Sequence, residues 1–285
     1  MAADPSTLVG GARLKHAVLV GAGRMGSAMA RGWIQDLSAA GVGRLSVVER
    51  APTEDVVEAA DDKLIVLNPP AEPADILVLA IKPQNFGKAV EGLKAWITPE
   101  TLIVSIMAGV TIARISAALG SEKVARAMPN TPGAIGMGAT AFALSPACSD
   151  AESVATGKLL EPLGLVIGPL KEDQMDAVTA VSGSGPAYVF LLVEALAAAG
   201  RSAGLGEATA NALARETVVG AGALLGNAAE SPAELRKAVT SPGGTTAAAL
   251  DVLMSAGGMP DLMRKAVDAA VRRGGELSRE AEKKD

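Results

Sequence analysis

The stretch AVLVGAGRMG, residues 17–26, decides the fold of the first half of the chain. Residues 17–20 form an apolar run long enough for a buried strand, and the pattern G-x-G-x-x-G follows at once. Behind it, residues 27–37 carry apolar side chains at helical spacing. A strand, a glycine turn and a helix in this order predict a dinucleotide-binding unit, whereas the glycines alone would indicate only a tight turn.

Each glycine has a place in this prediction. Gly21 allows the turn, Gly23 lets the backbone approach a pyrophosphate, and Gly26 lets the helix pack close to the strand. The helix N-terminus adds free N–H groups and the positive end of the helix dipole, both of which attract phosphate.

The next predicted strand, residues 45–48, ends at Glu49-Arg50. An acidic residue about 20 positions after the turn binds the ribose hydroxyls of NAD. An arginine at this place, or Arg24 inside the turn, instead suits the 2′-phosphate of NADP. A solvated strand end is a third interpretation of the pair, so the cofactor is predicted only as NAD(P).

Short apolar runs alternate with helical patterns through the first 170 residues. Further strands are predicted at residues 64–67, 75–81, 102–107, 124–128, 139–144 and 166–170. Such alternation predicts a Rossmann-type, doubly wound parallel sheet, in which ligands bind beyond the carboxyl ends of the strands. Those ends outline a site, and they are Gly21–Gly26, Glu49, Asn68, Lys82-Pro83, Ala108-Gly109 and Asn130-Thr131.

After residue 170 the pattern becomes helical, and we predict an all-α domain over residues 171–285 behind the α/β domain of residues 1–170. Helices are expected at 172–199, 207–228, 232–239, 246–256 and 261–277. Two glycine-rich stretches, residues 181–188 and 239–246, interrupt them and could be simple helix–helix turns.

The second glycine-rich stretch has the composition of an anion site. Gly243 and Gly244 leave backbone amides uncovered, and Thr245 and Thr246 open a helix whose first N–H groups face outward. Ser241 adds a hydroxyl. We therefore expect a cup for a small carboxylate.

The composition of the 285 residues excludes several classes of function. A net charge of −5 with scattered Lys and Arg predicts no nucleic-acid partner. The single Cys148 fits a reducing compartment, and His16 has no companions for a metal site. Residues 1–14 lack the apolar core of a signal peptide, and no apolar run approaches the ~20 residues of a membrane span. We expect a cytoplasmic protein without a membrane partner or a metal.

Helical residues 187–199 and 208–225 are apolar nearly all round, as buried helices are. A helical domain this small has too little interior to bury them all. We therefore predict an interlocked homodimer through the second half.

Five motifs together resemble the pyrroline-5-carboxylate reductase family. They are VGAGRMG (20–26), AIKPQ (80–84), RAMPNTP (126–132), DAVTAVSGSGPAY (176–188) and TSPGGTT (240–246). One departure is Ala238, where some relatives carry a polar side chain near the substrate. The resemblance implies NAD(P)H-dependent reduction of 1-pyrroline-5-carboxylate to L-proline, the last step of proline biosynthesis, in dimers that assemble into a ring of five.

The resemblance, together with the strand ends, implies a role for each site residue. The adenosine ribose is expected to lie near Glu49 and Arg50. The pyrophosphate is expected to be bound by Gly21, Ala22, Gly23, Arg24, Met25 and Gly26. The groove toward the nicotinamide is expected to be lined by Asn68, Ala80, Lys82, Pro83 and Gly109. An alternative for Lys82 is a solvated lysine at the strand end. The substrate carboxylate is expected to be bound by Ser241, Gly243, Gly244, Thr245 and Thr246. Thr246 or Thr179 is expected to hydrogen-bond the ring nitrogen or the nicotinamide amide; with Ser241 these are the candidate catalytic residues.

Two other classes of protein share parts of this pattern. A β-hydroxyacid dehydrogenase has a similar glycine turn and a helical second domain, but it needs a lysine that residues 182–192 lack. A non-catalytic dinucleotide-binding regulator usually carries a DNA-binding module, and no basic helix-turn-helix pattern is visible here.

Overall fold

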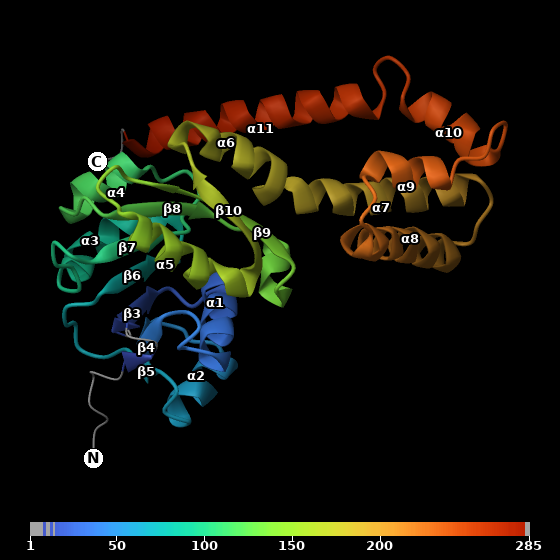
Figure 1. Cartoon of the computed structure of the whole chain (residues 1–285). Helices are drawn as coiled ribbons and strands as arrows, with labels where there is room; N and C mark the ends of the chain where they lie inside the picture. The colour runs from blue at the N-terminus through green and yellow to red at the C-terminus, as the bar shows by residue number, and fades with distance from the viewer. Residues whose placement is uncertain (1–7, 10–11, 14, 283–285) are drawn as a thin grey trace. The chain divides into compact units, whose positions relative to one another are not determined.

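The computed structural model describes residues 8–9, 12–13 and 15–282, and it divides into two compact units (Figure 1). The nucleotide unit comprises Met1–Gly183 and Ala270–Asp285, and the helical unit comprises Ser184–Ala269. The last strand ends at Leu170, and residues 171–183 pack with the sheet unit. Residues 1–14, which lack the apolar core of a signal peptide, lie mostly outside the described residues.

The nucleotide unit is built on an eight-stranded sheet with the order β10-β9-β8-β7-β6-β3-β4-β5. The strands are β3 (Lys15–Val20), β4 (Val42–Val48), β5 (Val66–Leu67), β6 (Ile76–Leu79), β7 (Leu102–Ser105), β8 (Val124–Met128), β9 (Gly138–Leu144) and β10 (Gly164–Leu170). A separate two-stranded pair joins β1 (Leu8–Val9) and β2 (Ala12–Arg13). Each strand of the large sheet overlaps a predicted one, and the Rossmann-type fold class is confirmed.

One strand pair departs from the predicted parallel arrangement. β9 runs antiparallel to β8, whereas β10 is parallel to β9. The connection from β8 to β9, residues 129–137, contains only the short turn Thr131–Ile135. A parallel crossover needs a dozen or more residues, so this connection is too short to carry the chain back across the sheet.

Helices connect most of the remaining strands. In the nucleotide unit they are α1 (Arg24–Gln35), α2 (Glu54–Asp61), α3 (Phe86–Lys94), α4 (Ile112–Leu119), α5 (Asp150–Leu160) and α6 (Met175–Val178). Thr111 caps the N-terminus of α4, because its side chain accepts a hydrogen bond from the Arg114 N–H.

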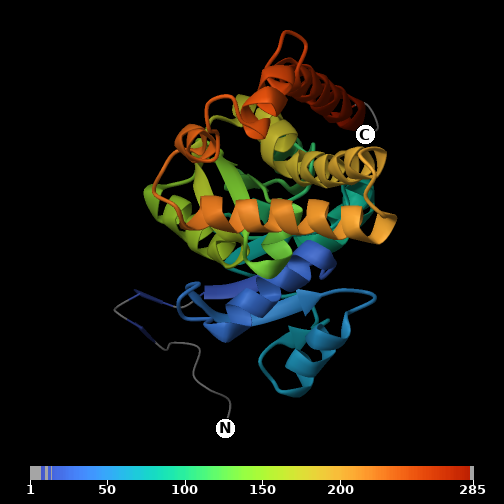
Figure 2. The same cartoon turned by 90° about the vertical axis from the view of Figure 1, so that its right-hand side faces the viewer.

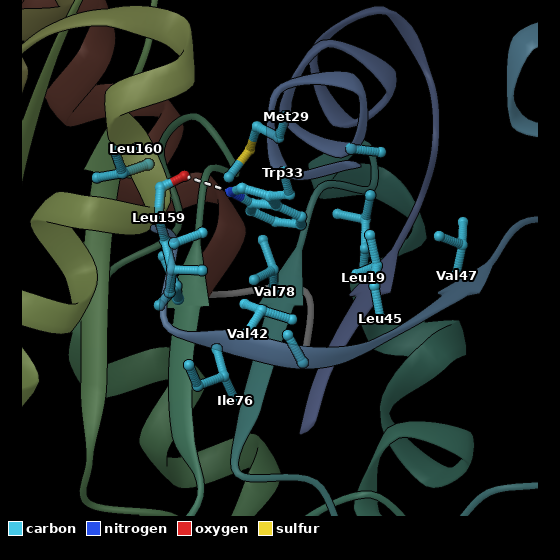
Figure 3. Packing of buried hydrophobic residues seen from close by; sticks show 14 of the residues in the cluster. Leu19, Met29, Trp33, Val42, Leu45, Val47, Ile76, Val78, Leu159 and Leu160 are labelled. Atoms are coloured by element: carbon cyan, nitrogen blue, oxygen red, sulfur yellow. Dashed lines mark hydrogen bonds between the residues drawn. The ribbon is translucent and has the colours of Figure 1, made fainter. Parts of the chain in front are cut away.

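The core of this unit is well packed (Figure 3). Trp33 of α1 is fully buried between the helices and the sheet, and its indole N–H donates to the Leu159 carbonyl at 2.8 Å. His16 of β3 is half-buried and hydrogen-bonds the Ser46 hydroxyl of β4 at 3.0 Å. The contacts of Trp33 fix α1, and with it the glycine turn that precedes it, on the sheet.

The helical unit contains α7 (Gly185–Ser202), α8 (Glu207–Asn227), α9 (Pro232–Ala238), α10 (Thr245–Leu253) and the first part of α11 (Met259–Glu282). α7 and α8 form a hairpin in which Gly200 lies close to Ala210, and Figures 1 and 2 show the two helices side by side. The predicted helix at residues 172–199 is broken by a π-helical turn at Thr179–Gly183.

One helical stretch bears on the expectation that the protein has no membrane partner. Helical residues Glu172–Ser202 are long and apolar enough, by length and composition, to cross a bilayer. The stretch is not an uninterrupted apolar run, because charged and glycine residues divide it. A single such helix is weak evidence for a membrane span, since helices that pack in soluble assemblies pass the same test.

Candidate dinucleotide site

The glycine turn has the geometry that the sequence pattern requires. Gly21 has a φ of +95°, a conformation that residues with a Cβ rarely adopt. A Cβ on Gly26 would overlap the Gly21 carbonyl oxygen, so α1 approaches the strand only because this residue is glycine. A Cβ on Gly23 would have no neighbour within 4 Å, so the backbone at Gly23 is open to a ligand.

A pocket of about 540 Å³ lies over the ends of β3, β4 and β6. It is lined by Val20, Gly21, Gly23, Val48, Glu49, Arg50, Ala80, Ile81, Lys82, Asn85, Lys88 and Ala89. Six residues predicted from the sequence therefore meet at one pocket, namely Gly21, Gly23, Glu49, Arg50, Ala80 and Lys82. The remaining turn residues and Asn68, Pro83 and Gly109 are not among its lining residues.

The carboxylate of Glu49 binds the backbone around the pocket. One oxygen, Oε2, accepts the Ala22 N–H at 2.8 Å, and the other, Oε1, accepts the Arg50 and Ala51 N–H groups at 2.8 and 3.0 Å. Burial by itself raises the pKa of this carboxyl, but the three N–H donors and the Arg50 charge outweigh it and lower the pKa. Glu49 is therefore a fixed anion in the pocket wall.

Asn68 lies at the end of β5, where its side chain holds the Glu49 backbone. Its Oδ1 accepts the Glu49 N–H and its Nδ2 donates to the Glu49 carbonyl, each at 2.9 Å. Asn68 has a φ of +47°, a left-handed conformation that asparagine tolerates better than most residues. The structure thus places Asn68 behind Glu49 rather than in the pocket wall.

Three pocket residues beyond Lys82 were not predicted from the sequence. Asn85, Lys88 and Ala89 lie three and four positions apart, so they share one side of the turn and helix that follow Lys82. With Arg50 and Lys82, Lys88 gives the pocket wall three cationic side chains beside one carboxylate. This spacing is the signal that could have found them.

The other predicted positions of the nucleotide unit lie beyond this pocket. Gly109 follows β7 with a φ of +72°, and a Cβ there would come within about 4 Å of Leu277 and Ser278 of α11. Thr179 begins the π-helical turn, and its hydroxyl donates to the Met175 carbonyl at 2.8 Å. Its oxygen lone pairs stay available to accept a further hydrogen bond.

The predicted carboxylate cup belongs to the helical unit. Gly243 has a φ of +71°, Gly244 is the N-cap of α10, and Thr245 and Thr246 are its first two residues. The Gly244 N–H donates to the Ser241 carbonyl at 3.0 Å, and no side chain caps the helix. The first N–H groups of α10 therefore have no intrahelical acceptor, as an anion site requires.

The site residues fit a dinucleotide. The open backbone at Gly23, the N-terminus of α1 and the adjoining pocket form a cradle for phosphates and a ribose. Among the residues that the structure describes, no group of three or more His, Cys, Asp or Glu side chains is placed to hold a metal ion. The fold and the pocket are those of a dinucleotide-dependent oxidoreductase.

Comparison with known families narrows this class. Residues 15–109 match the family described as NADP oxidoreductase, coenzyme F420-dependent, and residues 172–277 match the family described as pyrroline-5-carboxylate reductase dimerisation. The chain is 43% identical over 206 residues to the pyrroline-5-carboxylate reductase of Pseudomonas aeruginosa, covering 72% of this chain and 75% of that relative. It is 35% identical to pyrroline-5-carboxylate reductase 1 of Bacillus subtilis, covering 94% and 91%.

Solved structures agree with the sequence comparison. A pyrroline-5-carboxylate reductase from Coxiella burnetii matches with a TM-score of 0.81 at 35% identity, covering 93% of this chain and 99% of that one. The Plasmodium falciparum pyrroline carboxylate reductase, solved with NADP bound, matches with a TM-score of 0.73 at 26% identity, covering 93% and 98%. This chain belongs to the pyrroline-5-carboxylate reductase family, an assignment predicted from its motifs.

Proposed function

We propose that this protein reduces 1-pyrroline-5-carboxylate to L-proline with NADPH or NADH. Membership in the family carries the proposal, because relatives at 35–43% identity over most of the chain are named for this activity. The dinucleotide pocket at Gly21, Gly23 and Glu49 supports it independently. The rival β-hydroxyacid dehydrogenase and regulator interpretations have no comparable support.

Hydride transfer to this substrate requires little acid–base catalysis by the protein. When bound, the dihydronicotinamide supplies the hydride that adds to the carbon of the C=N bond. A ring nitrogen that enters as a protonated iminium becomes the neutral amine of proline, so no general acid is needed at that step. The protein's task is then to hold two reactants in the right orientation and to exclude water.

We assign the site residues accordingly. The turn Gly21–Gly26 holds the pyrophosphate, Glu49 and Arg50 lie toward the adenosine ribose, and Ala80 and Lys82 line the groove toward the nicotinamide. Pro83 and Gly109 extend that groove toward the nicotinamide, whereas Asn68, predicted for the same groove, holds the backbone of Glu49. In the helical unit, Ser241 and Gly243–Thr246 hold the substrate carboxylate, and Thr246 or Thr179 accepts a hydrogen bond from the ring nitrogen or the nicotinamide amide.

The second half forms an oligomer, as its match to a reductase dimerisation family indicates. We further propose that residues 171–285 act as the substrate-binding and dimerisation domain of an interlocked homodimer. We propose that five dimers form a ring, that the protein works in the cytoplasm, and that neither a membrane nor a nucleic acid is a partner.

The reaction is tested by following the absorbance of NADPH and of NADH as 1-pyrroline-5-carboxylate is added. We expect oxidation of at least one cofactor, with L-proline as the product identified by mass spectrometry. A 2-hydroxy acid offered with NAD⁺ or NADP⁺ should give no turnover. If neither reduced cofactor is consumed, the proposal is wrong.

The carboxylate cup is tested by Thr246→Val, which keeps the shape of the side chain and removes its hydroxyl. We expect kcat/KM for the imine to fall about tenfold, the size expected for one hydrogen bond to a polar substrate. The Kd of the cofactor should not change. Thr240→Val is the matched control, since the Thr240 hydroxyl donates to the Arg236 carbonyl within the preceding helix. An unchanged kcat/KM in Thr246→Val would remove this hydroxyl from the site.

A further inference from the structure

The peptide groups on both sides of Ala22 are fixed by side chains from outside the glycine turn. Ala22 is only 1% exposed, so its N–H must find a partner within the protein. That partner is the Glu49 carboxylate at 2.8 Å, and the Ala22 carbonyl accepts from the Ser27 hydroxyl at 2.6 Å. The orientation of the turn is therefore set by the chain itself.

The carboxylate that does this is itself held in place. Its second oxygen accepts two further backbone N–H groups, from Arg50 and Ala51. The Asn68 amide binds both backbone groups of Glu49 from the neighbouring strand end. Asn68, Glu49 and Ala22 follow β5, β4 and β3, so one chain of hydrogen bonds joins three adjacent strand ends.

This arrangement assigns Glu49 a role other than the predicted ribose contact. We propose that Glu49 and Asn68 are positioning residues that preset the glycine turn for the dinucleotide, so that Glu49 serves NADH and NADPH equally. A carboxylate that contacts the ribose favours NADH, because the 2′-phosphate of NADPH replaces a hydroxyl that it would bind. A carboxylate that holds the turn supports the pyrophosphate, which both cofactors share.

The first test measures amide hydrogen exchange at Ala22 in the cofactor-free protein by NMR. In Glu49→Ala the Ala22 N–H loses its acceptor, and we expect its exchange to accelerate about tenfold or more, consistent with the loss of a hydrogen bond to a charged group. Glu54→Ala is the control, because it removes the same charge from the exposed first turn of α2. Exchange at Ala22 that does not respond to Glu49→Ala would overturn the proposal.

The second test measures the Kd of NADH and of NADPH by titration. Glu49→Ala should weaken both about tenfold or more, with the ratio of the two Kd values unchanged. Asn68→Gly removes the amide while tolerating the positive φ, and should weaken both cofactors by a smaller common factor. Selective weakening of NADH would identify Glu49 as a ribose contact, and no weakening of either would leave it a solvated strand end; both outcomes overturn the proposal.

The binding test rests on the proposed function, whereas the exchange test does not. If the wild-type protein bound neither cofactor, the proposed function would fail while the exchange at Ala22 would still report the role of Glu49. Should Glu49→Ala fold poorly, Asn68→Gly and Glu49→Gln replace it. Glutamine has one acceptor oxygen where glutamate has two, so Glu49→Gln should leave either the Ala22 N–H or the Arg50 and Ala51 N–H groups without an acceptor, and exchange should accelerate on that side.

Discussion

The two units of this chain bury their apolar side chains to very different extents. In the nucleotide unit, large side chains such as Trp33, Met29 and Phe86 are essentially inaccessible to solvent. In the helical unit, the buried apolar residues among those described are only Ala197, Ala210 and Ala214. Large side chains along α7 and α8 lie exposed in the single chain, and they include Phe190, Leu191, Leu213, Val219 and Leu224.

The difference in burial indicates that the two units are stabilised by different contacts. The nucleotide unit encloses its own core, whereas the helical unit presents apolar surface of the kind that oligomer interfaces bury. The reductase dimerisation family that matches residues 172–277 agrees with this division. Three substitutions, in decreasing order of their predicted consequences, test this division.

The largest effect is expected from Leu191→Glu in α7. Leu191 is 62% exposed in the single chain, and a carboxylate placed in an apolar interface would have no partner. We expect the oligomer to dissociate, as measured by light scattering after size exclusion, and turnover to fall about a hundredfold or more. Val154→Glu in α5 is the matched control, at 60% exposure in the nucleotide unit, and it should leave assembly intact. An intact Leu191→Glu oligomer would show that this part of α7 is not buried in the oligomer interface.

A smaller effect, confined to the nucleotide unit, is expected from Trp33→Ala. The substitution opens a cavity in the core and should lower the free energy of unfolding by about 3–5 kcal/mol, measured by chemical denaturation. Trp33→Phe fills most of that space but leaves the Leu159 carbonyl without its donor, for a cost of about 1–3 kcal/mol. Equal losses in both variants would mean that the hydrogen bond, rather than the packing, dominates at this position.

The smallest effect is expected from Ser149→Ala, which removes the capping box of α5. Ser149 and Glu152 exchange hydrogen bonds at the helix N-terminus, and losing the hydroxyl should cost about 1 kcal/mol. Burial raises the pKa of Glu152, but bonds from Ser149 and the Lys123 charge outweigh it and lower the pKa below the ordinary 4.5.

This lowered pKa gives the substitution a pH dependence. A depressed carboxyl pKa stabilises the fold fully above the ordinary value and loses that contribution as pH falls through the folded value. The stability gap between wild type and Ser149→Ala should therefore shrink below about pH 4.5. Ser231→Ala removes the same motif from α9 of the helical unit and should leave unfolding of the nucleotide unit unchanged. A pH-independent gap would exclude Glu152 as the source.

Much of the fold could be predicted because local signals and tertiary packing agree. The glycine turn and the buried strands each follow from residue type and spacing. The prediction of a parallel sheet was wrong for β9, which runs antiparallel to β8. The connection after β8 is too short for a parallel crossover, so its length already indicated the antiparallel direction.

The candidate site was less predictable, because its contacts depend on which strand ends are neighbours. Glu49 and Asn68 were both singled out by position, yet their hydrogen bonds to each other follow only from the adjacency of β4 and β5. Lys88 was missed because it lies on α3, well beyond the end of β6 at Leu79. The hydrogen bonds that join Glu49 and Asn68 leave no periodic trace in a sequence.

The path of α11 makes the helical unit an insertion rather than an appendage. The chain leaves the nucleotide unit after Gly183 and returns to it at Ala270, so both chain ends belong to the same unit. Shortening the protein from its C-terminus therefore strips the nucleotide unit first, removing the neighbours of Gly109 and Asp176. Exchange of the helical unit between relatives would need two splice points, one on each side of residues 184–269.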